Sequence, residues 1–180
     1  LIEDSIWGCG YPEYVTGGNI ARQIVLRAGL PVSVAGTTVN RFCASGLQAL
    51  AMAAQMVRVE GAKAILAGGL ESISLVQTPQ MRVQPDPELV AMHKDIYMPM
   101  LQTAEVVAKR YGISRDAQDE YGFQSQQRTA AAQAAGFFDD EITAVAVAGR
   151  KGGEGVQVMR DEHPRADASA EALARLKPVF

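Results

Sequence analysis

The feature that most restricts the fold is an extended apolar run that ends near Cys43 and passes directly into a helical pattern. Between positions 32 and 39 many residues are β-branched, which favours a buried strand that we expect over residues 33–39. Beyond Cys43, small and apolar residues recur at helical spacing: Leu47, Leu50, Ala51, Ala54 and Val57. A strand that leads straight into a helix is typical of an α/β fold, and it places Cys43 at the turn between them.

The position of Cys43 indicates a nucleophile. The first N–H groups of a helix are free and carry the positive end of its dipole, so they favour the thiolate form of a cysteine there. Ala44, Ser45 and Gly46 are small enough to leave room for a substrate carbonyl. Backbone N–H groups in such a turn can also stabilise an oxyanion. The alternative is a structural cysteine, since free cysteines are often simply buried in a core.

The neighbouring segments continue the alternation of strands and helices. We expect a strand over residues 3–8, a helix over residues 19–28, an alanine-rich helix from Cys43 to Gly61 and a parallel strand over residues 62–67. Alanines on several sides of the third segment indicate a helix enclosed on all faces. The Gly68-Gly69 pair favours close backbone packing over a phosphate loop. Cys9, at the end of the first strand, is interpreted as a small buried residue.

Proline and methionine become frequent after Ser74, and this change predicts a domain boundary near residue 75. Residues 1–74 would form one domain and residues 75–180 another. In the second we expect helices over residues 103–111 and 115–135. A hairpin of residues 142–148 and 156–158 would follow, with Arg150 and Lys151 at its tip.

Composition excludes several classes of protein. A hydrophobic content of 48%, a charged content of 21% and a net charge of −3 over 180 residues are ordinary for a globular chain. A pI near 5.4 argues against a nucleic-acid surface. No apolar run is long enough for a membrane span and no leader pattern precedes the first strand, so we expect a cytoplasmic protein. Both cysteines are expected to be reduced and free, and no metal site is indicated.

One long motif covers the start of the alanine-rich segment, and a second follows its end. Residues 39–49 read Val-Asn-Arg-Phe-Cys-Ala-Ser-Gly-Leu-Gln-Ala, and residues 67–74 read Ala-Gly-Gly-Leu-Glu-Ser-Ile-Ser. In this order they closely resemble the thiolase family of acyl-CoA C-acyltransferases, and shorter matches occur at residues 17–23, 103–105 and 176–180. The resemblance covers essentially the whole chain. Because the chain starts at Leu1 and thiolases have segments on both sides, it is similar to an internal fragment of one.

The resemblance implies an α/β fold, with an N-terminal βαβ layer over residues 1–74 that carries an inserted α+β loop domain over residues 75–180. It also implies an acyltransferase of fatty acid metabolism, either an acetyl-CoA C-acetyltransferase or a 3-ketoacyl-CoA thiolase. Such an enzyme cleaves or forms 3-ketoacyl-CoA through an acyl-cysteine, here on Cys43. It needs no permanently bound cofactor, because coenzyme A arrives as part of the substrate.

The resemblance further implies that the loop domain covers the cysteine and binds coenzyme A. Met100, Arg165 and Phe180 are the coenzyme A contacts it suggests. For Arg165, a surface ion pair with Asp161 or Glu162 is the alternative. Thiolases assemble as homodimers or homotetramers, in which the strand that precedes the cysteine pairs with its own copy across a twofold axis. Such pairing would cover an apolar strand edge that would otherwise invite aggregation.

Three features leave alternatives open. Pro99-Met100-Leu101 stands where biosynthetic thiolases have His-Met-Gly, so acyl chain length and reaction direction are not assigned. Neither His93 nor His163 has a setting that aims it at Cys43, and the family's base and second cysteine come from C-terminal motifs not found here. A non-catalytic binding or dimerisation module is therefore one alternative. A ketoacyl synthase-like condensing enzyme is a weaker one, since the loop domain would be out of place in it.

Overall fold

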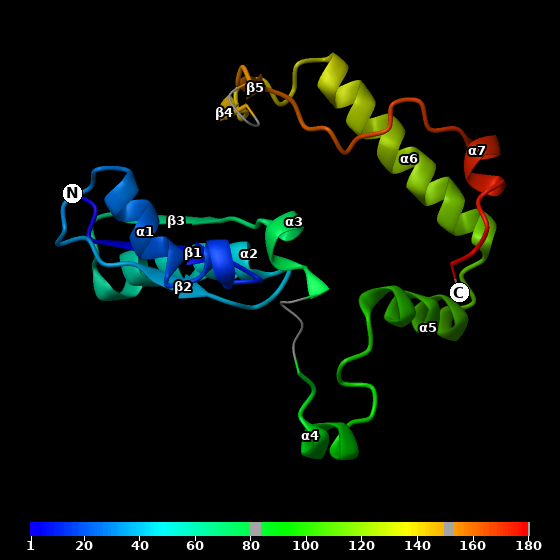
Figure 1. Cartoon of the computed structure of the whole chain (residues 1–180), viewed down its shortest axis with the longest axis horizontal. Helices are drawn as coiled ribbons and strands as arrows, with labels where there is room; N and C mark the ends of the chain where they lie inside the picture. Colours follow the sequence, from blue (N-terminus) through cyan, green and yellow to red (C-terminus); the bar gives the residue numbers. More distant parts are fainter. Residues whose placement is uncertain (80–83, 150–152, 180) are drawn as a thin grey trace. The chain divides into compact units, whose positions relative to one another are not determined.

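The computed structural model describes residues 1–79, 84–149 and 153–179 (Figure 1). The chain divides into two compact units, Leu1–Asp86 and Pro87–Phe180. The boundary expected near residue 75 falls on the short helix α3 (Ile73–Val76), which belongs to the first unit.

The first unit is built on a parallel sheet of three strands in the order β2-β1-β3 (Figure 1). The strands are β1 (Asp4–Gly8), β2 (Thr37–Val39) and β3 (Ile65–Gly69). Helix α1 (Ile20–Arg27) connects β1 to β2, after a 3-10 turn η1 (Tyr14–Thr16). Helix α2 (Ser45–Gln55) and the π-helical turn η2 (Met56–Glu60) connect β2 to β3. The predicted βαβ order and the α/β fold class are confirmed.

The two longer helices lie on opposite faces of this sheet. Ile6 and Trp7 are neighbours on β1, so their side chains point to opposite faces. Ile6 packs with Ala49 and Ala53 of α2. Thr38, which pairs with Trp7, accepts a hydrogen bond from the backbone N–H of Ala21 in α1 at 3.2 Å. Every buried residue that the structure describes lies in this unit, so the hydrophobic core is here.

Strand β2 is shorter than the predicted strand over residues 33–39, and helix α1 supplies the reason. The Arg22 guanidinium donates to the carbonyl oxygens of Val32, at 2.9 Å, and Val34. The N–H of Val34 donates a hydrogen bond to the carbonyl oxygen of Pro31 at 3.0 Å. Because these backbone groups are already bonded, the ladder with β1 begins only at Thr37.

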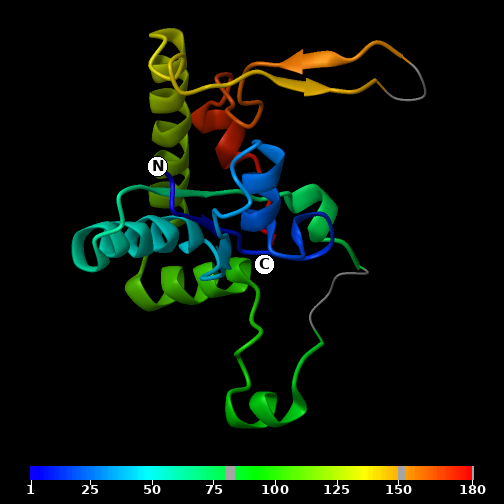
Figure 2. The same ribbon diagram turned by 90° about the vertical axis from the view of Figure 1, so that its left-hand side faces the viewer.

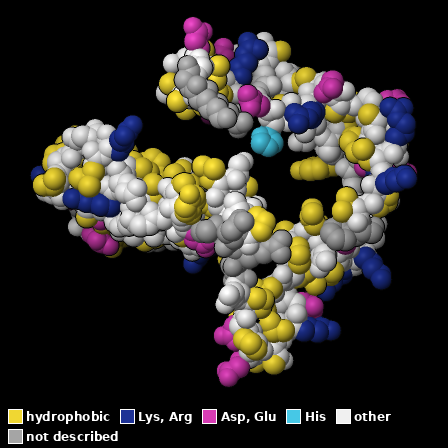
Figure 3. All heavy atoms as spheres, viewed as in Figure 1, with side chains coloured by type: hydrophobic (Ala, Val, Ile, Leu, Met, Phe, Trp, Pro, Cys, Tyr) yellow, Lys and Arg dark blue, Asp and Glu magenta, His cyan; other side chains and the backbone are white. Residues whose placement is uncertain are grey.

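Within the described part of the first unit, helix α2 is buried along one stripe rather than on all faces, contrary to the expectation. Ser45, Ala49 and Ala53 are buried, whereas Leu47 and Leu50 are 72% and 53% exposed. The buried residues recur every four positions and form one stripe against the sheet, so the opposite side faces outward. Figure 3 shows hydrophobic side chains at the surface of both units.

The second unit contains the remaining elements: α4 (Pro87–Met92), α5 (Met100–Tyr111), α6 (Arg115–Ala134), β4 (Val145–Val147), β5 (Val156–Val158) and α7 (Ala170–Ala174). The helices expected near residues 103–111 and 115–135 are confirmed as α5 and α6. Ser114 caps α6 by accepting the N–H of Ala117 at 3.2 Å, and Gly136 follows its end at φ 70°.

Strands β4 and β5 form the predicted antiparallel hairpin, with Val145 opposite Val158. Figure 2 shows its two arms projecting from the C-terminal end of α6. Arg150 and Lys151, expected at its tip, lie outside the described residues. Arg115 joins the first turn of α6 to α7, donating to the carbonyl oxygens of Leu173 at 2.8 Å and Leu176 at 3.1 Å.

Candidate functional site

Cys43 lies in the short turn between β2 and α2, as predicted. Its side chain is exposed and reduced, and Cys9 is the other free cysteine. The residue before it, Phe42, has a left-handed backbone with φ 48°, which is uncommon for a side chain of this size. The Asn40 carboxamide oxygen holds this conformation by accepting the N–H of Phe42 at 2.9 Å. The thiol is therefore presented by a turn of fixed shape.

Ser45 stabilises the other side of this turn by hydrogen bonds. Its buried hydroxyl accepts the N–H of Arg41 at 2.9 Å and donates to the carbonyl oxygen of Phe42 at 2.6 Å. Its own N–H bonds to the same carbonyl oxygen at 3.0 Å. From the sequence, Ser45 is expected only as a small neighbour of Cys43. A serine at the start of a helix is the signal that could have identified this role.

The N-terminus of α2 is open to an anion. The residue at its N-cap is Ala44, which has no side-chain oxygen and makes no side-chain cap. The N–H groups of Ala44 and Ser45 bond the carbonyl oxygens of Arg41 and Phe42 within the turn, at 3.1 and 3.0 Å. The N–H groups available to a negatively charged group near Cys43 are therefore those of Gly46 and Leu47 in the first turn of α2. This arrangement suits an oxyanion in the turn.

Glycines at the ends of β1 and β3 bring α2 close to the sheet. A Cβ atom on Gly8 would overlap the backbone carbonyl of Ser45 and lie 2.5 Å from the nitrogen of Gly46. A Cβ on Gly69 would lie 3.2 Å from the Cα of Gly46. The predicted close backbone packing is therefore confirmed at Gly69, whereas Gly68 lies against the ring of Trp7, with a Cβ placed there 2.8 Å from it.

Cys9 lies beneath the turn and is only 1% exposed. Burial raises the pKa of the Cys9 thiol, and a hydrogen bond to the Glu71 carboxylate raises it further. Its N–H donates to the carbonyl oxygen of Val39 at 3.0 Å. The interpretation of Cys9 as a buried residue is confirmed, and its raised pKa disfavours the thiolate form.

Glu71 has a structural role that is not apparent from the sequence. It follows β3, and its Oε1 atom accepts the N–H of Gly10 at 2.5 Å. The two residues are 61 positions apart, so neither periodicity nor a local motif could have paired them. The carboxylate joins the loops that follow β1 and β3.

Of the three coenzyme A contacts suggested by resemblance, two are described and both lie in the second unit. Met100 is the first residue of α5 and is 73% exposed. Arg165 is exposed, and its N–H donates to Oε1 of Gln126 at 2.7 Å. Phe180 lies outside the described residues.

The guanidinium of Arg165 contacts backbone rather than carboxylates. Its Nη1 atom donates to the carbonyl oxygens of Glu162 and His163, both at 3.2 Å. Among the described residues it forms no ion pair with Asp161 or Glu162, so that alternative finds no support. The ion pair with both partners described is Arg115–Asp119, at 2.8 Å.

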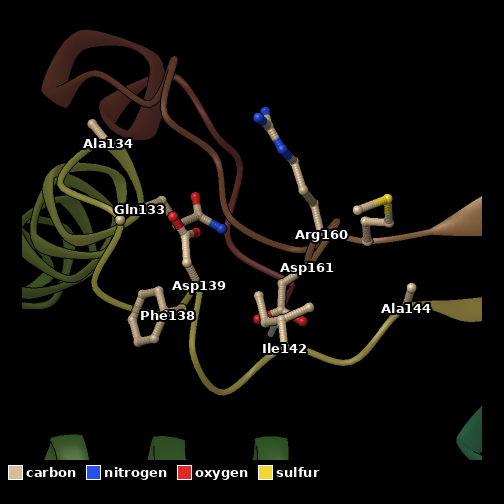
Figure 4. Close-up of a pocket in the computed structure, with 10 residues that line it drawn as sticks. Gln133, Ala134, Phe138, Asp139, Ile142, Ala144, Arg160 and Asp161 are labelled. Carbon is tan, nitrogen blue, oxygen red and sulfur yellow. The ribbon is translucent and has the colours of Figure 1, made fainter.

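A hollow of about 920 Å³ lies at the C-terminal end of α6 and the base of the hairpin (Figure 4). Its lining includes Gln133, Phe138, Asp139, Ile142 and Asp161. Figure 4 shows the Asp139 carboxylate beside the Gln133 side chain. Neither Cys43 nor a proposed coenzyme A contact lines it. The carboxylates of Asp139 and Asp161 outnumber the Arg160 guanidinium in its lining, which does not favour an anion such as a coenzyme A phosphate.

Within residues 1–79, 84–149 and 153–179, no group of three or more His, Cys, Asp or Glu side chains is arranged to hold a metal ion. In the same ranges no helix has both the length and the apolar character needed to cross a membrane. Both histidines, His93 and His163, are exposed and lie in the second unit.

The parallel sheet with helices on both faces places the chain among the α/β proteins, and its candidate site is an exposed cysteine in the turn between a strand and a helix. Within that class, the chain belongs to the thiolase family: the model of the thiolase N-terminal domain matches residues 1–180.

Named relatives agree with the family. The chain is 43% identical to a beta-ketoadipyl-CoA thiolase of Acinetobacter baylyi and 42% identical to a 3-ketoacyl-CoA thiolase of Bacillus subtilis, each match covering 99% of this chain and 48% of the relative. It is 40% identical to an acetyl-CoA acetyltransferase of Pseudomonas aeruginosa, over 92% of this chain and 45% of the relative. The chain thus spans about half the length of the curated relatives it matches.

Proposed function

We propose that the full-length protein containing this chain transfers acyl groups between coenzyme A thioesters, with Cys43 as the nucleophile. The observation that carries the proposal is the exposed Cys43 thiol at the uncapped N-terminus of α2. The family match and the relatives' names support it, since they include two thiolases and an acetyltransferase. These names favour an enzyme over a binding module or a ketoacyl synthase.

In the cleavage direction, the Cys43 thiolate would attack the 3-keto carbon of a 3-ketoacyl-CoA. The C2–C3 bond then breaks, the acyl group stays on sulfur, and C2 of the departing acetyl-CoA takes a proton. A coenzyme A thiol next attacks the acyl-cysteine, loses its proton, and leaves as acyl-CoA while the Cys43 thiolate is restored. Condensation is the reverse sequence, so one site serves both directions.

The turn supplies two further contributions. The N–H groups of Gly46 and Leu47, in the first turn of α2, are suited to the oxyanion that forms when sulfur adds to the carbonyl. The small residues Ala44 and Gly46 leave space for the substrate, and a Cβ placed on Gly46 would meet nothing within 4 Å. The proton transfers need an acid–base group besides Cys43.

We assign coenzyme A thioesters as the substrate class, with no permanently bound cofactor. The three relatives' names differ in the acyl group, so the family match does not select a chain length. Residues 1–74 would hold the nucleophile and residues 75–180 would form the loop domain that covers coenzyme A. In that domain Met100, Arg165 and Phe180 are the proposed contacts. The proposed compartment is the cytoplasm, where both thiols would stay reduced.

We also propose a homodimer, or a homotetramer built from it. The supporting feature is that β2 lies at an edge of the three-stranded sheet. An unpaired strand edge offers free N–H and C=O groups that a second copy can bond, which gives a twofold interface. Sedimentation of the full-length protein as a monomer at micromolar concentration would contradict this assembly.

The nucleophile is tested by Cys43→Ala in the full-length protein, with Cys9→Ala as the matched control. Loss of a covalent nucleophile should abolish the acyl-enzyme seen by mass spectrometry and lower kcat by at least about three orders of magnitude. Cys9→Ala should keep the acyl-enzyme. Acyl label retained on Cys43→Ala would place the nucleophile elsewhere.

A further inference from the structure

The Glu71 carboxylate reaches across the end of the sheet to a loop that supports the Cys43 turn. Its Oε1 atom accepts the N–H of Gly10 at 2.5 Å. The same carboxylate lies near the buried thiol of Cys9 and raises its pKa. One carboxylate therefore acts on two successive residues of the loop after β1, and its bond to Gly10 fixes that loop.

That loop lies directly against the residue before Cys43. A Cβ atom on Gly10 would lie 3.3 Å from the carbonyl oxygen of Phe42 and 3.4 Å from Oε2 of Glu71. Gly10 is thus held between the Phe42 carbonyl and the Glu71 carboxylate. A side chain at this position would press on both.

Phe42 needs such support because its backbone is in the left-handed region, at φ 48°. A bulky residue keeps this conformation only where its surroundings enforce it. Asn40 bonds its N–H and Ser45 bonds its carbonyl oxygen, both from within the turn. Gly10, fixed by Glu71, adds support to Phe42 from outside the turn.

Glu3 makes the same kind of bond at the opposite end of the same strands. Its Oε1 atom accepts the N–H of Lys63 at 3.2 Å, bridging the start of β1 to the segment before β3. Both bonds join a carboxylate to a backbone N–H across about sixty residues of sequence. Only the bond of Glu71 adjoins the turn of Cys43.

We infer that Glu71 is a positioning residue, which fixes the Cys43 turn through its hydrogen bond to Gly10. The inference rests on the proposed function, because it assigns Glu71 a part in acyl transfer by Cys43. Glu71 acts through Gly10 and Phe42 and does not touch the substrate. Its contribution is to hold the sulfur at a fixed distance from the bound carbonyl, where a small displacement slows the reaction strongly.

The test compares Glu71→Ala, Glu71→Gln and Glu3→Ala in the full-length protein by steady-state kinetics. Glu71→Ala removes the acceptor, so kcat should fall about ten- to a hundredfold while KM for the acyl-CoA stays within about twofold. The amide oxygen of Glu71→Gln can still accept the N–H of Gly10, so kcat should stay within about threefold of the parent. Glu3→Ala should match the parent enzyme.

Three results would overturn the inference. They are an unchanged kcat in Glu71→Ala, an equal loss in Glu71→Gln, or an equal loss in Glu3→Ala, which would indicate general weakening of the sheet. If Glu71→Ala does not fold, Glu71→Asp replaces it, because the shorter side chain draws the carboxylate back from Gly10. A kcat loss of at least about fivefold at constant KM is then expected, and an unchanged kcat rejects the inference.

Cys43→Ala in the same assay separates this inference from the proposed function. Activity retained in Cys43→Ala would reject Cys43 as the nucleophile and the proposed role of Glu71 with it. An inactive Cys43→Ala together with a fully active Glu71→Ala would reject the role of Glu71 alone.

Discussion

The backbone N–H of Cys9 donates to the carbonyl oxygen of Val39 at 3.0 Å, which ties the buried cysteine to the last residue of the strand that leads to the exposed one. The two thiols thus lie near the same end of the sheet in opposite environments. Cys9 is enclosed and its pKa is raised, whereas Cys43 is accessible at the start of a helix. This difference leads to separate predictions for the two residues.

Iodoacetamide should alkylate Cys43 much faster than Cys9 at neutral pH. Cys43 is exposed just before the first turn of α2, whereas Cys9 is 1% exposed and has a raised pKa. Peptide mapping by mass spectrometry after short exposure of the full-length protein measures both rates. We expect a ratio of at least about a hundredfold. Equal rates would contradict the environments described for the two cysteines.

Cys9 should make stability depend on pH in the alkaline range. Because its pKa is raised in the folded state, the folded protein holds this proton more tightly than the unfolded chain does. That contribution is complete below the ordinary thiol pKa and is lost as pH rises through the raised value. Urea unfolding from about pH 7 to pH 10 measures it.

The comparison for this prediction is Cys9→Ala, with Cys43→Ala as the control. Cys9→Ala should be less stable than the parent by about 1 kcal/mol near neutral pH, since it loses buried contacts. The difference should shrink as pH rises, while Cys43→Ala keeps the alkaline pH dependence of the parent. A difference that stays constant with pH would argue against a raised pKa.

Gly8→Ala should strongly destabilise the protein. The new Cβ would overlap the backbone of Ser45, and neither the strand nor the helix terminus can move without disturbing the Cys43 turn. We expect a loss of about 3 kcal/mol or more in the free energy of unfolding. Urea unfolding measures it where the variant folds, and loss of soluble protein is the stronger form of the same result.

Gly46→Ala is the matched control for this substitution. A Cβ at Gly46 meets nothing within 4 Å, and alanine favours a helix over glycine by about 1 kcal/mol. Its stability should equal or exceed that of the parent protein. Equal losses of stability in Gly8→Ala and Gly46→Ala would show that the lack of space between α2 and the sheet does not explain the effect of Gly8→Ala.

Arg165→Ala should weaken coenzyme A binding if its guanidinium meets a phosphate, as we propose. The loss should be about tenfold at low ionic strength and smaller in high salt, because ions screen this contact. Isothermal titration calorimetry at two salt concentrations measures it. Arg128→Ala, which removes another arginine of the same unit, is the control and should not change affinity.

Met100→Ala should act differently from Arg165→Ala in the same titrations. Met100 is 73% exposed at the start of α5 and offers apolar area to the pantetheine arm. Its removal should weaken binding by about threefold to tenfold at both salt concentrations. A loss that disappears in high salt would point to an electrostatic origin and against this contact.

Local sequence determined the order of elements and the place of Cys43. Helical spacing after Cys43, the serine cap at Ser114 and glycines at positive φ after η2, α5 and α6 depend on residues a few positions apart, so the printed sequence reveals them. The same holds for the hairpin of β4 and β5. The motifs around Cys43 are likewise contiguous in the chain, so they are sufficient by themselves to indicate the thiolase family.

Tertiary structure alone decided how long β2 is, which face of α2 is buried and what supports the cysteine turn. The Arg22 guanidinium bonds the carbonyl oxygens of Val32 and Val34, so these residues take no part in the ladder between β1 and β2. The Glu71 carboxylate bonds the N–H of Gly10, which lies 61 residues away in the sequence. Such bonds join positions that no periodic pattern relates. They form only after the chain has folded, when the carboxyl ends of the parallel strands β1 and β3 bring the loops that follow them side by side.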